Sequence, residues 1–197
     1  WTWEMQALTR LRAVAGDDAL GRRAEEIVRA ALARPRDTEK TRAEVADMRV
    51  RMDRERPSKT IWDLKLAPGG FVDIEFIAQA LHLTGGAIAR DVLSPNTGEA
   101  LAKLVAAGLL APDVGARLAS AWRLWSDLTQ MLRVCVAGDF APETAPPPLM
   151  ARLAAIAGVE GAEALERRVR TVQQAVRGDF VQIVGAPGDG NAAQPRS

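Results

Sequence analysis

Apolar residues recur along most of the chain at the three- and four-residue spacing of an α-helix, and the alternation typical of strands is nearly absent. The pattern predicts an all-α protein, a bundle of seven or eight helices. Breaks rich in glycine, proline and aspartate separate the helical stretches. The helices are expected at residues 1 to about 15, 17–34, 37–56, 71–84, 98–107, 113–136, 149–157 and 160–184.

Polar residues that favour N-cap positions precede three of these stretches. Asp17 or Asp18 is expected to cap the second helix, Asp37 the third, and Asn96 or Thr97 the fifth. In each case the side-chain oxygen can accept a hydrogen bond from an amide in the first turn.

Three helices show a clear apolar face that we expect to be buried. The faces comprise Ala7, Leu11 and Val14; Val45, Met48 and Met52; and Leu118, Trp122, Trp125 and Leu132. Tryptophans three residues apart on a long helix are interpreted as core residues rather than as a stacking platform.

Two connections divide the chain. Residues 57–70 hold two prolines and a Gly-Gly pair, and residues 138–148, "GDFAPETAPPP", form a stiff linker. We therefore expect a helical domain at 1–137 and a small C-terminal helical subdomain at 138–185. The tail at 186–197 is expected to be disordered, because it has too little apolar content to repay its ordering entropy.

The composition narrows the function classes. The 26 Lys and Arg residues balance 25 Asp and Glu residues to a net charge of +1, which argues against a nucleic-acid binder; salt-dependent nucleic-acid binding would revive that class. No apolar run reaches the roughly 20 residues of a membrane helix. One cysteine and one histidine exclude a zinc-type cluster. Cys135 is expected to fill core space, and a reducing cytoplasm is the expected location.

A polar seam runs through the stretch "DLKLAPGGFVDIEFIAQALH", residues 63–82. Glu75, Gln79 and His82 follow the i, i+4, i+7 spacing and so lie in one line on a helix that is otherwise apolar. A helix with so few polar positions is normally central to its domain. The seam must then reach either a partner within the protein or a cleft.

Both interpretations of the seam stay open. In the structural one, the helix dipole favours Asp73 and Glu75 in the first turn, Lys65 provides their counter-charge, and Gln79 and His82 bond neighbouring carbonyls. In the functional one, the seam lines a cleft or an interdomain face, and the Gly-Gly turn lets another backbone approach closely.

Other candidate features favour ordinary structural roles. Arg10 and Arg12 lie on different faces of the first helix. Contact with a phosphate is one interpretation of either residue, and solvation or ion pairing is the favoured one. The run "RVRMDRERP", residues 49–57, is interpreted as a solvated helix face. Gly69 and Gly70 lie outside any phosphate-loop motif.

The chain resembles the glutamine-synthetase adenylyltransferases, also called glutamate-ammonia-ligase adenylyltransferases. The resemblance rests on "WTWEMQALTRLRAVAGD" (1–17), "DLKLAPGGFVDIEFIAQ" (63–79) and "NTGEALAKLVAAGLL" (96–110), and it extends to about Arg133. Two departures are Met5, where the family usually has histidine, and "DLTQMLR" near the end of the long helix. Related uridylyltransferases fit the tryptophan-rich opening less well.

The resemblance implies a helical domain from a large cytoplasmic enzyme with two nucleotidyltransferase halves. One half uses ATP and Mg²⁺ to attach AMP to a tyrosine of glutamine synthetase, and the other removes it. The opening and the Asp-Ile-Glu-Phe motif are similar to the C-terminal, transferase half. The implied partners are its own nucleotidyltransferase domain, glutamine synthetase and the PII nitrogen-signal protein, with no nucleic acid and no membrane.

The catalytic Asp-x-Asp of such enzymes does not occur in this sequence. We therefore expect the chain itself to be inactive and to hold no cofactor, serving domain packing and partner positioning. The candidate interdomain or cleft-facing residues are Lys65, Asp73, Glu75, Gln79, Arg10 and Arg12. The opening without methionine suggests a piece of a longer chain. The alternative is a non-enzymatic helical protein-binding module.

Overall fold

The computed structural model describes residues 1–88 and 92–186, and this part of the chain is helical without strands, which confirms the all-α prediction. The expected tail falls almost entirely outside the described residues. The helices are α1 (Thr2–Leu8), α2 (Asp18–Leu32), α3 (Thr38–Glu55), α4 (Phe71–Thr84), α6 (Thr97–Ala106), α7 (Pro112–Cys135), α8 (Pro147–Ile156) and α9 (Ala162–Ile183). Short 3₁₀ turns lie at Gly86–Ile88 and Pro142–Thr144.

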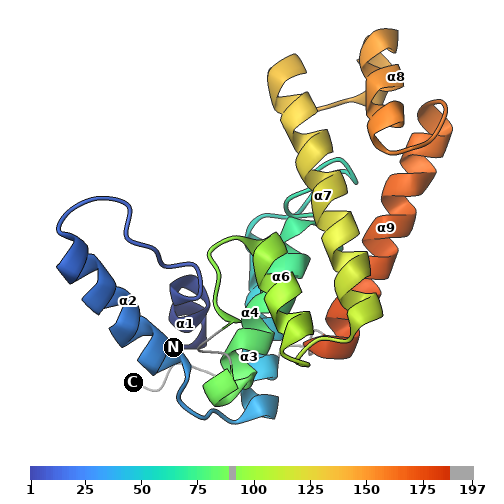
Figure 1. Ribbon diagram of the computed structural model, residues 1–197. Helices are drawn as coiled ribbons and strands as arrows, with labels where there is room; N and C mark the ends of the chain where they lie inside the picture. Colours follow the sequence, from blue (N-terminus) through green and yellow to red (C-terminus); the bar gives the residue numbers. More distant parts are fainter. Residues whose placement is uncertain (89–91, 187–197) are drawn as a thin grey trace.

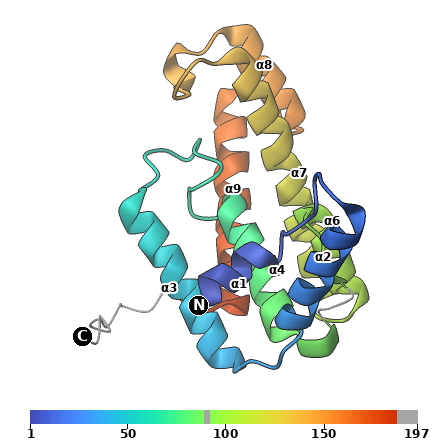
Figure 2. The same ribbon diagram turned by 90° about the vertical axis from the view of Figure 1, so that its left-hand side faces the viewer.

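Helix α4 lies at the centre of the fold. Every one of its residues is buried except Phe71, Glu75 and Thr84, as its nearly continuous apolar composition predicts. Helices α3, α6, α7 and α9 pack around it (Figures 1 and 2). The three apolar residues predicted on α3 lie where expected, with Val45 buried and the two methionines packed against the core.

Helices α7 and α9 run side by side, with α8 at their far end (Figures 1 and 2). Trp125 of α7 is fully buried, and Trp122 packs against the core from its edge, so both act as core residues. The contiguous core includes residues from both sides of position 137. The division into a domain and a subdomain stays a prediction.

The first helix is shorter than predicted. Helix α1 ends at Leu8, and the Thr9 hydroxyl bonds the Gln6 carbonyl at 2.7 Å, as short polar side chains do where they compete with helical hydrogen bonds. The predicted apolar face is wrong: Leu11 is exposed, and Val14 is 79% exposed. The buried residues of this segment are instead polar, Gln6 and Thr9.

Helix α2 projects from the body of the molecule (Figure 1). Its apolar side chains Leu20 and Ile27 are 68% and 61% exposed, and only Leu32 at its end is buried. We call residues 1–31 the N-terminal arm.

The predicted N-caps are confirmed. Asp17, Asp37 and Asn96 each accept a hydrogen bond from the amide three residues later, at 2.8, 2.9 and 3.0 Å. The predicted burial of Cys135 is wrong, because the last turn of α7 runs past the core and leaves residues 133–135 exposed. None of the described helices combines the length and apolar character that crossing a membrane requires.

Candidate functional site

The connection at residues 57–70 folds back onto the start of α4. The amides of Gly70, Phe71 and Val72 donate to carbonyls within the connection, at 2.8, 2.8 and 3.2 Å. Helix starts leave such amides unsatisfied, and Gly70 has no side chain to cap them. The connection therefore takes the place of a side-chain cap and fixes the direction in which α4 leaves it.

The Gly-Gly pair lets two backbones approach the turn closely. Gly69 has φ +80°, and a Cβ there would lie 2.0 Å from the carbonyl oxygen of Gln173 on α9. A Cβ on Gly70 would lie 2.5 Å from the carbonyl oxygen of Leu64. The Gly69 carbonyl also accepts a hydrogen bond from Trp125 Nε1 at 3.2 Å. The close approach expected from the glycines thus occurs within this chain.

Asp73 is fully buried at the centre of this junction. Its Oδ1 accepts from Arg49 Nε, and its Oδ2 accepts from the Gly69 amide at 2.8 Å and from Arg177 Nη1 at 3.2 Å. The carboxylate therefore joins α3, the turn and α9. The prediction that Lys65 would be its counter-charge is wrong, because two arginines occupy that role and the Lys65 side chain is exposed.

Arg49 of α3 is the residue that sequence reasoning missed. It is 0% exposed and also donates to Asp53 and, at 2.8 Å, to the Leu66 carbonyl. Burial by itself lowers the pKa of Arg49, but its attraction to the carboxylate of Asp73 and its hydrogen bonds outweigh that effect and raise the pKa. The interpretation of residues 49–57 as a solvated face is therefore wrong at this position. A signal existed: Arg49 lies four residues after Val45, on the buried face of the helix.

The rest of the seam mostly holds the N-terminal arm against α4. Arg10 Nη1 lies 2.9 Å from Glu75 Oε1, and Gln6 Nε2 donates to Gln79 Oε1 at 3.0 Å. Within the described residues, Gln6 Oε1 is buried without a hydrogen-bond partner. Gln79 thus bonds a side chain rather than the backbone carbonyl that the structural interpretation expected.

His82 lies in the last turn of α4, at the C-terminal end of the seam. Its Nε2 donates to the Val92 carbonyl at 3.3 Å, in agreement with the structural interpretation. Burial, opposed by that hydrogen bond and reinforced by the charge of Lys103, lowers the pKa of His82 to about 4. The ring is therefore neutral at neutral pH, and its role is to tie α4 to the segment before α6.

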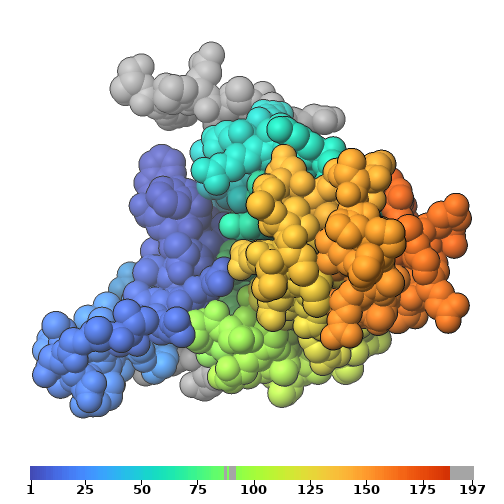
Figure 3. Space-filling model, turned by 90° about the horizontal axis from the view of Figure 1, so that it is seen from above, coloured from blue at the N-terminus to red at the C-terminus, as the bar shows by residue number. Residues whose placement is uncertain are grey.

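A cleft of about 860 Å³ opens between α4, α7 and the connection. Figure 3 shows the surface hollowed between the N-terminal arm, the connection and α7. Three candidate residues, Arg10, Lys65 and Glu75, line this cleft, whereas Asp73 and Gln79 are buried and Arg12 does not line it. The structure thus places Asp73 in the buried junction, Gln79 against the N-terminal arm, and Arg10, Lys65 and Glu75 at the open cleft.

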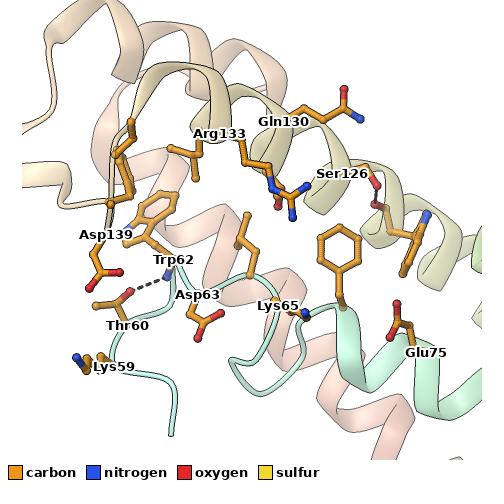
Figure 4. A pocket seen from close by; sticks show the side chains of 18 of the residues that line it. Lys59, Thr60, Trp62, Asp63, Lys65, Glu75, Ser126, Gln130, Arg133 and Asp139 are labelled. Carbon is orange, nitrogen blue, oxygen red and sulfur yellow. Dashed lines mark hydrogen bonds between the residues drawn. The ribbon is translucent and has the colours of Figure 1, made fainter. Parts of the chain in front are cut away.

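Other cleft residues come from the connection, from α7 and from the linker after it. They include Lys59, Thr60, Trp62, Asp63, Ser126, Gln130, Arg133, Asp139 and Phe140 (Figure 4). Across residues 1–88 and 92–186, no three His, Cys, Asp or Glu side chains lie close enough to hold a metal ion together. The described residues therefore do not fit a Mg²⁺ site, and we assign them no metal-dependent step.

Comparison with known proteins identifies the family. The family model "GlnD PII-uridylyltransferase" matches residues 39–184, from α3 to the end of α9. The chain belongs to this family. Its similarity therefore continues well past Arg133, where the resemblance found in the sequence stopped.

Curated relatives confirm the resemblance to glutamine-synthetase adenylyltransferases. Proteins from Mesorhizobium japonicum, Rhizobium meliloti and Caulobacter vibrioides are 41%, 43% and 45% identical to the chain over 94%, 94% and 93% of its length. Each is named bifunctional glutamine synthetase adenylyltransferase/adenylyl-removing enzyme. The chain spans 19% of the length of each of these relatives.

Proposed function

We propose that this chain is the helical domain of the transferase half of a cytoplasmic enzyme that adenylylates and de-adenylylates a tyrosine of glutamine synthetase. The observation that carries the proposal is the 41–45% identity to enzymes of that name over nearly the whole chain. In that enzyme ATP and Mg²⁺ supply AMP to the tyrosine hydroxyl, and pyrophosphate leaves.

The residues that catalyse nucleotidyl transfer are expected to lie outside this chain. Nucleotidyl transfer requires closely spaced carboxylates that hold Mg²⁺ between the ATP phosphates and the attacking hydroxyl. The sequence has no Asp-x-Asp, and the described residues hold no cluster suited to a metal. The domain's part is to pack against the nucleotidyltransferase domain and to position glutamine synthetase or the PII protein.

Two features of the structure support a packing and positioning role. At the junction around Asp73, ion pairs and hydrogen bonds to the backbone hold α3, α7 and α9 against the Gly-Gly turn and the start of α4 in one fixed arrangement. The N-terminal arm leaves large apolar side chains in solvent, which is typical of surfaces that meet another domain. These exposed side chains are Trp1, Trp3, Val14, Leu20 and Ile27.

The full-length protein tests the proposal directly. Purified with glutamine synthetase and ATP labelled at the α-phosphate, it is expected to transfer the label to a glutamine synthetase tyrosine and to remove it under reversing conditions. The 197-residue chain alone is expected to do neither. Absence of transfer by a folded full-length protein would contradict the proposal.

The alternative is a non-enzymatic helical binding module, favoured only by the exposed apolar arm. The native reading frame upstream of Trp1 distinguishes the two. A Gly-Ser and Asp-x-Asp pair on a strand pattern within about a hundred residues, the size of a small domain, supports the enzyme. A frame that starts near Trp1, or an unrelated preceding domain, supports the binding module.

A further inference from the structure

The N-terminal arm is attached to the body of the molecule without a share in its core. The contiguous apolar core of the described residues begins at Val45 and includes no residue of the arm. Three side-chain contacts join the arm to α3 and α4. They are Thr2 with Glu44, Gln6 with Gln79 at 3.0 Å, and Arg10 with Glu75 at 2.9 Å. Polar contacts therefore do much of what hydrophobic burial does for most helices of a fold.

Two of these contacts are weak ones. Arg10 is 48% exposed in its ion pair with Glu75, and exposed ion pairs contribute little to stability and are screened by salt. Gln6 is buried, yet its Oε1 finds no hydrogen-bond donor among the residues that the structure describes. A buried acceptor without a donor is destabilising, and water would satisfy it if the arm lifted from α4. The docked arm therefore depends on a salt-sensitive contact and carries one feature that favours its release.

The arm is braced internally, so it can move as one piece. The Ala13 amide donates to Glu25 Oε1 on α2 at 3.0 Å. A Cβ on Gly21 would lie 2.9 Å from the Cβ of Ala13, so the chain after α1 packs closely on α2. Helix α2 also packs against α1. These contacts join the two helices to each other independently of the contacts to α4.

The corner between α2 and α3, residues 33–37, keeps the far end of the arm attached. Leu32 is fully buried, and the Arg36 guanidinium donates to the carbonyls of Leu32 and Ala31 at 2.7 and 2.9 Å. Arg36 thereby satisfies carbonyls that the end of α2 leaves unpaired. Residues at the ends of helices commonly act as hinges. A rotation at this corner lifts α1 from α4 while Leu32 stays in place.

The contact between Arg10 and Glu75 also forms part of the cleft, since both residues line it. Figure 3 shows the arm as one side of the hollow. We propose that the arm is a strap, which closes this side of the cleft when docked on α4 and opens as a unit about the corner at 33–37. Opening widens the cleft and frees the Glu75 carboxylate. The proposal goes beyond the proposed function, because it concerns a movement of this chain and does not depend on AMP transfer.

Single-molecule fluorescence energy transfer in the 197-residue chain tests the strap. The dyes are attached through Glu26→Cys on α2 and Arg152→Cys on α8, two exposed positions, with the exposed native cysteine removed by Cys135→Ser. Figure 1 places these two helices on opposite sides of the molecule. The docked strap is expected to give one transfer efficiency and the open strap a second, and the areas of the two peaks give the ratio of open to closed molecules.

Charge variants and salt are expected to shift this ratio. Glu75→Ala should raise it about threefold, the effect of losing one exposed ion pair, and Arg10→Glu about tenfold, because repulsion is added. The combined change Arg10→Glu with Glu75→Arg restores the ion pair and should return the ratio to the wild-type value. Raising the salt from 0.05 to about 1 M should act on the wild type as Glu75→Ala does. Glu166→Ala, which removes an exposed partner of Arg170 on α9, is the matched control.

The glutamine pair provides a change in the other direction. Gln6→Met combined with Gln79→Met replaces both amides with apolar groups of similar shape, and so removes the unpaired oxygen together with its neighbour. This variant is expected to lower the ratio of open to closed molecules about threefold and to stay closed at high salt. A ratio at or above that of the wild type would show that the buried oxygen does not favour release.

Three results would overturn the strap. One is a single transfer efficiency in every variant and at every salt concentration, and another is a shift in the Glu166→Ala control equal to that in Glu75→Ala. The third is a loss of amide-exchange protection throughout α2 in Arg10→Glu, because the arm would then unfold rather than move as a unit. None of these results bears on the AMP-transfer assay, so the two proposals fail separately.

Discussion

The junction around Asp73 and the N-terminal arm reverse the usual distribution of side chains in opposite ways: the junction buries charged groups, and the arm exposes apolar ones. At the junction, the charged side chains of Arg49 and Asp73 are fully buried and form an ion pair with each other. In the arm, apolar side chains such as Ile27 are exposed, and the contacts to α4 are polar. A buried charge network fixes one arrangement, whereas exposed apolar surface is available to a partner. We therefore expect substitutions at the junction to lower the free energy of unfolding strongly and substitutions in the arm to change it little.

The largest effect is expected from removing the buried carboxylate. Asp73→Ala leaves Arg49 buried without its counter-charge and should lower the free energy of unfolding by about 3–5 kcal/mol. Urea denaturation measures the loss. Asp113→Ala, which removes an exposed partner of Arg117, is the control and should cost at most about 1 kcal/mol. Equal losses would show that burial at the junction is energetically unimportant.

Gly69→Ala is expected to have the next largest effect. The new Cβ meets the backbone of Gln173 and must also adopt a positive φ, so the loss should reach about 3 kcal/mol. Gly158→Ala separates the two causes, since Gly158 also has a positive φ but open space around it, and about 1 kcal/mol is expected. If both variants lose the same amount, the close approach of α9 does not constrain the turn.

Acidification should destabilise the fold through His82. Its folded pKa of about 4 lies below the ordinary value of 6.5, so the unfolded chain binds the proton more readily between these values. Stability is therefore present above pH 6.5 and declines as the pH falls toward 4, by about 2 kcal/mol between pH 7 and pH 5. Denaturation curves at several pH values test this. His82→Gln should flatten the dependence in that window, and an unchanged slope would assign it to other groups.

The smallest effect is expected in the arm. Ile27→Ser replaces an exposed apolar side chain and should change the free energy of unfolding of this chain by no more than about 0.5 kcal/mol. Ile74→Ser, in the fully buried part of α4, is the contrast and should cost several kcal/mol, about the cost of removing a core side chain. A large loss for Ile27→Ser would show that the arm is part of the core after all.

Local signals predicted much of the fold. The bounds of α4 are those expected, because a Pro-Gly-Gly turn precedes it and Gly85 follows it. The N-cap residues predicted from the sequence gave the starts of three helices correctly. The errors arose where tertiary context decides: apolar residues after Leu8 follow the helical spacing but meet no core, and Cys135 lies beyond the packed part of α7.

The candidate site was predicted less completely than the fold. Spacing identified the seam, and the structure gives each of its residues a contact. The two arginine partners of Asp73 lie 24 and 104 residues away in sequence, so no local pattern could pair them with it. The cleft likewise depends on α7 and on the linker after it, which converge only in the folded chain.

The most direct test of the positioning role measures AMP transfer to glutamine synthetase by the full-length protein carrying Glu75→Ala, which releases Arg10 from α4 at the edge of the cleft. Glu160→Ala, an exposed change before α9, is the matched control. We predict that Glu75→Ala lowers the transfer rate about tenfold or more, equivalent to ~1.4 kcal/mol. The Glu75→Ala protein is expected to have the same melting temperature as the Glu160→Ala control. Transfer at the wild-type rate by folded Glu75→Ala protein would contradict this role and make the seam purely structural.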